Sequence, residues 1–163
     1  MHNKILRAMS EREEAYVLRG KIQLDDAYLG GERSGGKAGR GSENKIPIVS
    51  SVSLNEAGHP IHIKITPAQG FSSEAIRAWA SQNLSPGCAV LTDGLACFRS
   101  IVTAGCSHEA IVTGGKHPND LPQFRWINTL LGNLKTSLSG TFHAFNFDKY
   151  ARRYLGGYCF RFN

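Results

Sequence analysis

The sequence predicts one α/β domain, built on a mixed sheet of three antiparallel strands followed by parallel strands and flanked by helices. Two observations predict it. The first third of the chain holds three segments with the period of β-strands, and the rest alternates short apolar segments with helical ones. A chain of 163 residues can bury about 70% of the surface that its unfolded form exposes, so one core is enough. No internal repeat or second domain is apparent.

A lead-in helix and a first strand open the predicted fold. Residues 1–20 place apolar side chains between charged ones at a spacing that suits a short helix. Residues 21–29, with the sequence KIQLDDAYL, alternate apolar and polar side chains as a half-buried strand does. Because successive side chains of a strand point to opposite faces, Asp25 and Asp26 should face away from each other.

Two further strands complete an antiparallel meander. Residues 30–45, GGERSGGKAGRGSENK, are rich in glycine and basic residues, and we interpret them as a positively charged hairpin loop. Residues 46–54 and 60–66 follow as strands, joined by a turn with the sequence NEAG. Three successive strands with looped connections indicate antiparallel pairing.

The middle of the chain is predicted to form a helix and then short strands that lie parallel in the sheet. Ser72 or Ser73 can cap a helix whose apolar side chains fall on one face. The apolar residues 89–92 then form a short strand that stops at Asp93, and residues 109–113 form another. A buried strand that follows a helix usually lies parallel in a sheet covered on both faces.

Two amphipathic helices are predicted at the end of the chain. Residues 126–138 carry a broad apolar stripe. On its polar side, Asn128 and Lys135 are seven residues apart, so their directions differ by only about 20° and they lie roughly 10 Å apart. A last helix turns its aromatic side chains inward and its two arginines, Arg152 and Arg153, outward.

Charge and cysteine content narrow the class of protein. Basic residues exceed acidic ones by six (19 against 13), and residues 116–163 hold seven basic residues against two acidic ones. Such a bias suits a polyanionic partner, although a merely solubilising surface has the same composition. The four cysteines form no C-x-x-C pair, which favours buried free thiols over a zinc ribbon. No segment approaches the roughly 18 apolar residues of a membrane span, so we expect a soluble cytoplasmic protein.

Carboxylates at strand ends are candidates for metal binding. Ligand sites in mixed sheets gather where the order of connections reverses, and Asp25 and Asp93 would meet there if the first and fourth strands are neighbours. Two carboxylates a few ångströms apart repel each other, and a divalent cation is the usual compensation. Hard oxygen ligands favour Mg²⁺ or Mn²⁺ over zinc. An Asp before Gly is also typical of a turn, which is the structural alternative for Asp93.

Four blocks of the sequence resemble the successive signature blocks of insertion-sequence transposases with a DDE-type integrase core of ribonuclease H-like fold. They are QLDDAYLGGE (23–32), VLTDG (90–94), WINTLLGNLKTSLSGTFHAF (126–145) and RRYLGGYCFRFN (152–163). The blocks fall in the family's order and span nearly the whole chain. More narrowly, they resemble the subgroup whose triad reads Asp, Asp, Asn, with a Lys seven residues after the Asn.

The resemblance implies roles for individual residues. Asp25, Asp93 and Asn128 would form the catalytic triad and ligate the metal, with Asp26 as the rival of Asp25, since strand alternation lets only one of the pair face the site. Lys135 would contact DNA near the scissile end. His143 would contact DNA or orient a ligand, and a hydrogen-bonded, partly buried histidine is the alternative. Further candidate DNA contacts, suggested by charge, are Arg152, Arg153, Lys37 and Arg40.

The implied activity is that of a DNA transposase, a metal-dependent polynucleotidyl transferase. It would cleave DNA at insertion-sequence ends and join those ends to target DNA, using a site with two Mg²⁺ or Mn²⁺ ions. Its partners would be both kinds of DNA and further copies of the chain, in a homo-oligomer on DNA.

Other readings of the same residues stay open. The family usually carries a module that recognises the element's ends ahead of the core, and nothing of that kind precedes residue 21. We therefore expect a catalytic core at residues 21–163 without this module, in a chain that would be inactive if it needs the missing part. One alternative is an inactive or truncated remnant that only binds nucleic acid. Another is a ribonuclease H-like nuclease that cuts without strand transfer.

Overall fold

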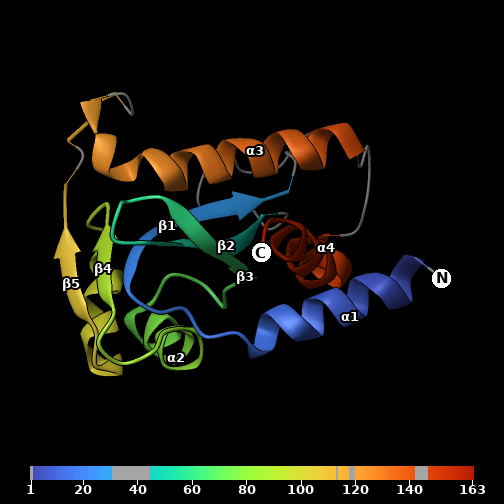
Figure 1. Cartoon of the computed structure of the whole chain (residues 1–163), viewed down its shortest axis with the longest axis horizontal. Helices are drawn as coiled ribbons and strands as arrows, with labels where there is room; N and C mark the ends of the chain where they lie inside the picture. Colours follow the sequence, from blue (N-terminus) through green and yellow to red (C-terminus); the bar gives the residue numbers. More distant parts are fainter. Residues whose placement is uncertain (1, 31–44, 113, 118–119, 142–146) are drawn as a thin grey trace.

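A five-stranded mixed sheet lies at the centre of the structure, with its strands in the order β3-β2-β1-β4-β5. The computed structural model describes residues 2–30, 45–112, 114–117, 120–141 and 147–163. The strands are β1 (Lys21–Leu29), β2 (Ile46–Leu54), β3 (Pro60–Pro67), β4 (Ala89–Thr92) and β5 (Ser107–Ala110). In Figure 1, helix α3 (Arg125–Thr141) runs along one side of this sheet and α2 (Ser73–Asn83) lies on the other.

The strands pair as the sequence predicted. β1 pairs with β2, and β2 with β3, in antiparallel orientation, because the chain returns each time beside the strand that it has just left. β4 follows α2 and pairs with β1 in parallel orientation, since a helix carries the chain back to the starting end of the sheet. β5 pairs with β4 in the same way. The predicted α/β class, with antiparallel strands followed by parallel ones, is therefore confirmed.

The last strand begins earlier than predicted. The sequence favoured residues 109–113, where apolar side chains gather, whereas β5 spans Ser107–Ala110. The four residues of β4 pair with residues 107 to 110 and offer no further register partners. Because β5 lies at the edge of the sheet and is mostly exposed, its first residues are polar and carry no apolar strand pattern. Residue 113 lies outside the described residues.

Helices cover both faces of the sheet. α2 and the 3-10 helix η1 (Ala96–Ala104) pack on one face, and α3 and α4 (Phe147–Phe162) pack on the other. α1 (His2–Ala15), predicted as a lead-in helix, packs along α4, and η3 (Pro122–Phe124) directly precedes α3. The predicted serine cap of α2 is Ser72, whose hydroxyl accepts a hydrogen bond from the amide of Ala75 at 3.1 Å.

Strand alternation divides the apolar side chains into two cores. Ile22 and Leu24 of β1 are buried against α2 and η1, in a core that also holds Phe98. Leu29 of β1 belongs to the opposite core, together with Ile127 of α3. The odd-numbered side chains of β1 therefore face α3, and the even-numbered ones face α2.

Buried polar contacts hold α1 and the end of α4 against the edge strand β3. Lys64 of β3 is 2% exposed, and its Nζ donates to the carbonyl oxygens of Glu14 and Tyr16 at the end of α1. The Asn163 side chain accepts from the amide of Ile63 at 2.8 Å and donates to its carbonyl at 3.0 Å, as a neighbouring strand would. The two Asn163 bonds occupy backbone groups of Ile63 that an edge strand otherwise exposes.

The cysteines belong to the two cores. All four are free and buried, as predicted: Cys88, Cys97 and Cys106 beside α2, and Cys159 beside β3 and α4. Burial raises the pKa of the Cys159 thiol to about 12, so this side chain stays protonated at neutral pH. As to membranes, none of the helices in the described parts of the chain is long and apolar enough to cross one.

The close approach of α1 and α4 gives a test of this packing. A Cβ atom at Gly156 would lie 2.6 Å from the Cα atom of Ser10, a backbone atom that cannot move without shifting α1. In urea unfolding, we expect Gly156→Ala to lower the free energy of unfolding by about 1–3 kcal/mol. Gly132→Ala on α3 is the matched control. Nothing lies within 4 Å of a Cβ atom there, so it should be neutral or raise stability by up to about 1 kcal/mol. Equal effects of the two substitutions would contradict the packing described.

Candidate functional site

The parallel pairing of β1 and β4 brings the two predicted aspartates together. Gln23 is the register partner of Leu91, so Asp25 and Asp93, each two residues further on, reach neighbouring positions at the same end of the sheet. One carboxylate oxygen from each of Asp25, Asp26 and Asp93 lies within 4.8 Å of the others. The acidic group expected where the first and fourth strands meet is thus present.

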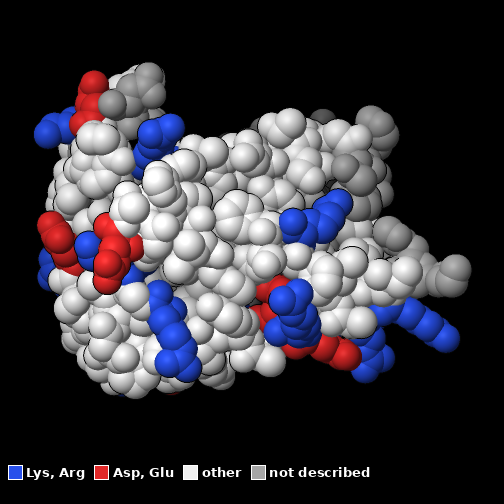
Figure 2. Space-filling model, viewed as in Figure 1, with Lys and Arg blue, Asp and Glu red and all other residues white. Residues whose placement is uncertain are grey.

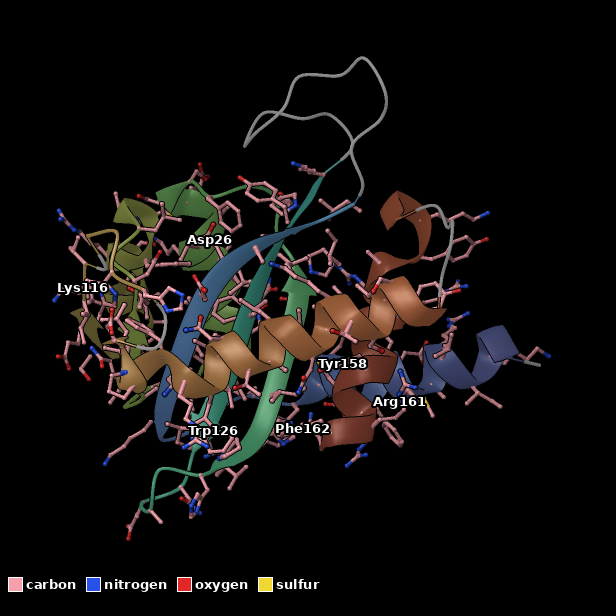
Figure 3. The ribbon with its side chains drawn as sticks, turned by 90° about the horizontal axis from the view of Figure 1, so that it is seen from above. Asp26, Lys116, Trp126, Tyr158, Arg161 and Phe162 are labelled. Atoms are coloured by element: carbon pink, nitrogen blue, oxygen red, sulfur yellow. The ribbon has the colours of Figure 1, made fainter. Side chains whose placement is uncertain are left out.

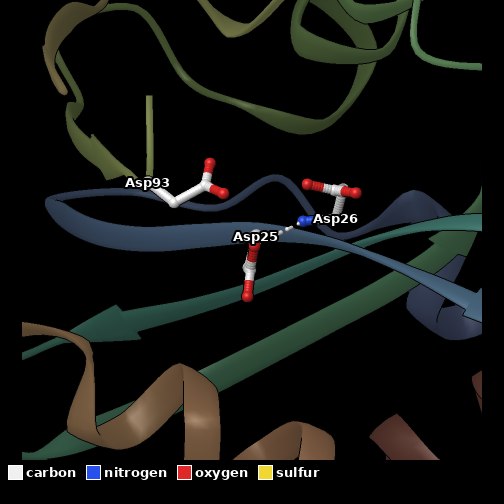
Figure 4. A group of neighbouring side chains, drawn as sticks. All are labelled: Asp25, Asp26 and Asp93. Carbon is white, nitrogen blue, oxygen red and sulfur yellow. Dashed lines mark hydrogen bonds between the residues drawn. The ribbon is translucent and has the colours of Figure 1, made fainter. Parts of the chain in front are cut away.

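Asp26 belongs to this group as well. Figure 4 shows the carboxylates of Asp25 and Asp26 on different sides of β1, as strand alternation requires. The Asp26 amide nevertheless donates to Oδ1 of Asp25 at 2.9 Å, and a carboxylate oxygen of Asp26 stays within the group. Alternation therefore does not separate Asp26 from the other two carboxylates, and the choice between Asp25 and Asp26 as a ligand stays a prediction.

The turn after β4 holds Asp93. Its Oδ1 accepts a hydrogen bond from the amide of Leu95 at 3.1 Å, and Gly94 between them has a φ of +93°, which L side chains rarely adopt. The hydroxyl of Thr92 accepts from the Gly94 amide at 3.3 Å and lies 2.8 Å from Nε2 of His108. Asp93 is therefore a turn residue, and the turn fixes the position of its carboxylate beside Asp25.

Burial and neighbouring charge oppose ionisation of Asp25. Loss of hydration, then the charges of Asp93 and Asp26, raise the pKa of the Asp25 carboxyl from 3.8 to about 7. The Asp26 amide and the Lys135 ammonium lower this pKa but do not offset the rise. The site therefore concentrates more negative charge than its own surroundings neutralise.

Helix α3 lies over the face of β1 that carries Asp25, and Figure 3 shows it crossing above the strands. Lys135 of α3 is exposed and close enough to Asp25 to lower its pKa. Asn128 is half-buried and lies about two turns earlier on the same side of the helix. The preceding amide, that of Ile127, donates to Oε1 of Gln23 on β1 at 3.0 Å. A direct contact between Asn128 and the carboxylates stays a prediction.

The surroundings of Asp25 fit a bound cation. Carboxylate oxygens are the ligands that Mg²⁺ and Mn²⁺ prefer. Ser50 lies opposite Asp25 in the pairing of β1 with β2, is fully buried, and has a hydroxyl without a hydrogen-bond partner among the described residues. An unsatisfied buried hydroxyl costs roughly 1–3 kcal/mol. Since paired residues point to the same face of a sheet, this hydroxyl and the Asp25 carboxylate lie on one face.

The other predicted DNA contacts are placed differently. Arg152 of α4 pairs with Glu14 of α1 at 3.4 Å, so it joins two helices beside β3, at the edge of the sheet opposite to β5. The guanidinium of Arg153 lies 5.8 Å from the centre of the Tyr150 ring on the same helix. Their contacts with DNA stay predictions. Three further candidates lie outside the described residues: Lys37, Arg40 and His143.

Basic side chains do not form one continuous patch on the face drawn in Figure 2. The lysine and arginine groups are scattered there, and acidic groups stand beside several of them. The basic excess of the C-terminal third is likewise divided between separate places, with Lys135 near Asp25 and Arg152 beside α1. The charge bias of the sequence therefore does not mark a single binding surface on this face.

Two residues beside the acidic group, Gln23 and Ser50, were not singled out from the sequence. Both are polar and at most 5% exposed. A signal for Gln23 was present, because strand alternation places it on the same face as Asp25 and a buried amide requires a partner. Ser50 carried no such signal, since small polar side chains are common in strands.

Comparison with known proteins identifies a family. The family model described as ISXO2-like transposase domain matches residues 17–163. A search of curated proteins gave no match. The matched residues include every strand of the sheet and every candidate ligand, from β1 to the end of α4.

The raised pKa of Asp25 makes the stability of the metal-free protein depend on pH. Between the ordinary pKa of 3.8 and about 7, the folded protein holds a proton that the unfolded chain has lost. The free energy of unfolding therefore falls as the pH rises through this window and stays low above it. Asn cannot ionise, so we expect the free energy of unfolding of the Asp25→Asn variant to exceed that of the parent by about 2–4 kcal/mol near pH 8. Near pH 4 the two free energies should differ little. Urea unfolding in the presence of a chelator measures this difference.

The control for that measurement is Glu56→Gln, which removes an exposed carboxylate from the turn between β2 and β3. It should leave the pH profile of the parent unchanged. A constant difference between Asp25→Asn and the parent at all pH values would show that Asp25 ionises normally.

Proposed function

Because the chain belongs to the ISXO2-like transposase domain family, we propose that its acidic group is the centre of metal-dependent DNA strand cleavage and strand transfer at insertion-sequence ends. Membership of this family supports a transposase function. The observation that supports the chemistry is the group of three carboxylates at the meeting of β1 and β4, with Lys135 beside Asp25. Such a group is suited to hold cations against a phosphodiester.

The carboxylates have the central role in this proposal. Asp25 lies on β1 and Asp93 in the turn that directly follows the neighbouring strand β4, so the pairing of the two strands brings their carboxylates together before any ligand binds. Asp26 offers a third carboxylate oxygen within reach. Mg²⁺ or Mn²⁺, in a site of two ions, would lower the pKa of an attacking water or 3′-hydroxyl and stabilise the leaving oxygen.

Helix α3 supplies the side chains that complete the site. Asn128 offers one amide oxygen where most related enzymes have a carboxylate, which keeps a ligand atom but lowers the negative charge of the site. Lys135, exposed on the same side of α3, would bind a phosphate of the DNA next to the acidic group. Cleavage and joining then need only alignment and charge stabilisation, without a covalent protein intermediate.

The partners in this proposal are insertion-sequence ends, target DNA and at least one further copy of the chain. A basic protein gains affinity for DNA from the release of counterions, and the chain carries a net charge of +6. Two ends of one element need two catalytic centres in the same complex, which is why we propose a homo-oligomer on DNA. The cytoplasmic location expected from the sequence stays a prediction.

The first test removes the proposed ligands. We expect Asp25→Ala and Asp93→Ala to reduce cleavage of a labelled insertion-sequence end by at least about 100-fold in Mn²⁺, since each removes a charge that aligns the reaction. Circular dichroism should show a folded protein. Asp120→Ala, which removes an exposed aspartate elsewhere, should keep the parent's activity. Unfolding of both site variants would instead make the aspartates structural.

The same assay separates transposase from nuclease chemistry. With a pre-cleaved end and a target plasmid, the parent protein should produce joined products. Cutting without joining would favour a ribonuclease H-like nuclease, and DNA binding without any nicking in Mn²⁺ would favour an inactive binding remnant.

The second test concerns the asparagine. Asn128→Glu adds a carboxylate, so we expect the dissociation constant for Mn²⁺ to fall by about tenfold, measured by calorimetry or by water-proton relaxation. Asn133→Glu is the matched control, because it adds the same charge to the exposed surface of the same helix in another direction. An equal effect of the two substitutions would mean that Asn128 lies outside the ligand shell.

A further inference from the structure

One buried hydrogen bond joins β1, which carries the candidate ligand Asp25, to α3, which carries the candidate ligand Asn128. Gln23 of β1 is 5% exposed, and its Oε1 accepts from the backbone amide of Ile127 on α3 at 3.0 Å. Gln23 is two residues from Asp25, and Ile127 directly precedes Asn128. The bond therefore connects the two elements next to the residues that the proposed site needs.

The amide of Ile127 depends on an acceptor from outside its own helix. Ile127 is the third residue of α3, and the first four amides of an α-helix have no partner within that helix. A side chain of the helix's own N-terminal turn usually satisfies them. Here the acceptor comes from another element, because Gln23 reaches the helix from the sheet.

The hydrogen bond constrains the rotation of α3 on the sheet, which apolar packing alone does not determine. Ile127 and Leu134 of α3 are fully buried and set how closely the helix lies on the sheet. Apolar contact is not directional, whereas a hydrogen bond weakens steeply when its angle departs from linearity. A slip of α3 by one residue would turn its side chains by about 100° and move them by about 1.5 Å along the axis.

Gln23 and Asp25 also share one face of β1. Alternation places both side chains toward α3, and Gln23 lies in the middle of the sheet, with register partners Val52 on β2 and Leu91 on β4. Gln23 therefore belongs to a strand whose backbone is paired on both sides, which makes it a rigid support. Rigid elements preserve the geometry of a site more closely than loops do.

We propose that Gln23 is a positioning residue, which sets the rotation of α3 on β1 so that Asn128 and Lys135 face Asp25. Gln23 touches neither metal nor DNA in this arrangement, and its effect passes through the backbone of Ile127. The inference rests on the proposed function, because it assigns Gln23 a part in the same metal site.

The substitution that tests it is Gln23→Met, which keeps the length of the side chain and removes the acceptor. We expect Mn²⁺ affinity and kcat for cleavage to fall by about 10- to 100-fold, the range found for residues that orient ligands, while KM for DNA changes less than about threefold. Hydrogen exchange of the Ile127 amide should become faster. Gln23→Glu retains an acceptor oxygen and should keep the slow exchange of this amide.

A double-mutant cycle distinguishes positioning from general stability. If Gln23 acts through Asn128, then Gln23→Met should weaken Mn²⁺ binding strongly in the parent and little in an Asn128→Ala background. Ile76→Val, a destabilising change in the core on the other face of the sheet, should leave Mn²⁺ affinity unchanged. If Gln23→Met does not fold, Gln23→Asn, whose acceptor is too short to reach, takes its place with the same expected losses.

Failure of this inference differs from failure of the proposed function. A parent protein that binds no Mn²⁺ and cleaves no DNA would overturn the proposed function. A parent that does both, with Gln23→Met unchanged in Mn²⁺ affinity and kcat, would overturn the positioning role alone. Equal losses in both backgrounds of the cycle would also overturn it, since the effect would then not pass through Asn128.

Discussion

The parallel pairing of β4 with β1 is the constraint on which the rest of the structure depends. It inserts a strand from the second half of the chain beside the first strand, in a register that places Asp93 next to Asp25. The acidic group is therefore a result of topology, since the two residues are far apart in the sequence. This arrangement is electrostatically unfavourable: burial and two neighbouring carboxylates raise the pKa of Asp25 to about 7. Apolar burial on both faces of the sheet supplies the stability that tolerates it.

The two faces of β1 carry different kinds of side chain. Ile22 and Leu24 bury apolar surface against α2 and η1, and Asp26 follows them on the same face. The other face carries Gln23 and Asp25 under α3, beside the buried hydroxyl of Ser50. Polar groups in a core weaken it unless they are paired, and Gln23 meets this condition by accepting from the Ile127 amide. One face of the strand thus mainly buries apolar surface, while the other carries Gln23 and Asp25 beneath α3, and the acidic group receives a carboxylate from each face.

Sequence reasoning predicted the parts of this structure that depend on local pattern. Periodicity of two predicted β1 to β3, periodicity near 3.6 predicted α2 and α3, and the succession of these segments along the chain predicted the order of the elements. β5 was misplaced because an edge strand is half-exposed and lacks the apolar pattern. The nearness of the Asp26 carboxylate to the other two was not predicted, because strand alternation describes only the directions of side chains and not the position of Asp93. The contact of Gln23 with Ile127 joins residues about a hundred positions apart, and one sequence without a structure contains no local signal for such a pair.

A site of this kind links metal binding to folding. The repulsion among Asp25, Asp26 and Asp93 is present only when the chain is folded, because the unfolded chain separates Asp93 from the other two and hydrates all three. A cation that neutralises them binds the folded state and not the unfolded one, so it stabilises the fold by an amount that grows with its concentration. In the proposed metal site, the charge that the fold tolerates in the metal-free protein would therefore be the same charge that attracts a divalent ion. The pairing of β1 with β4 strengthens this coupling, since it holds Asp25 and the turn that carries Asp93 next to each other and limits how far the groups can move apart.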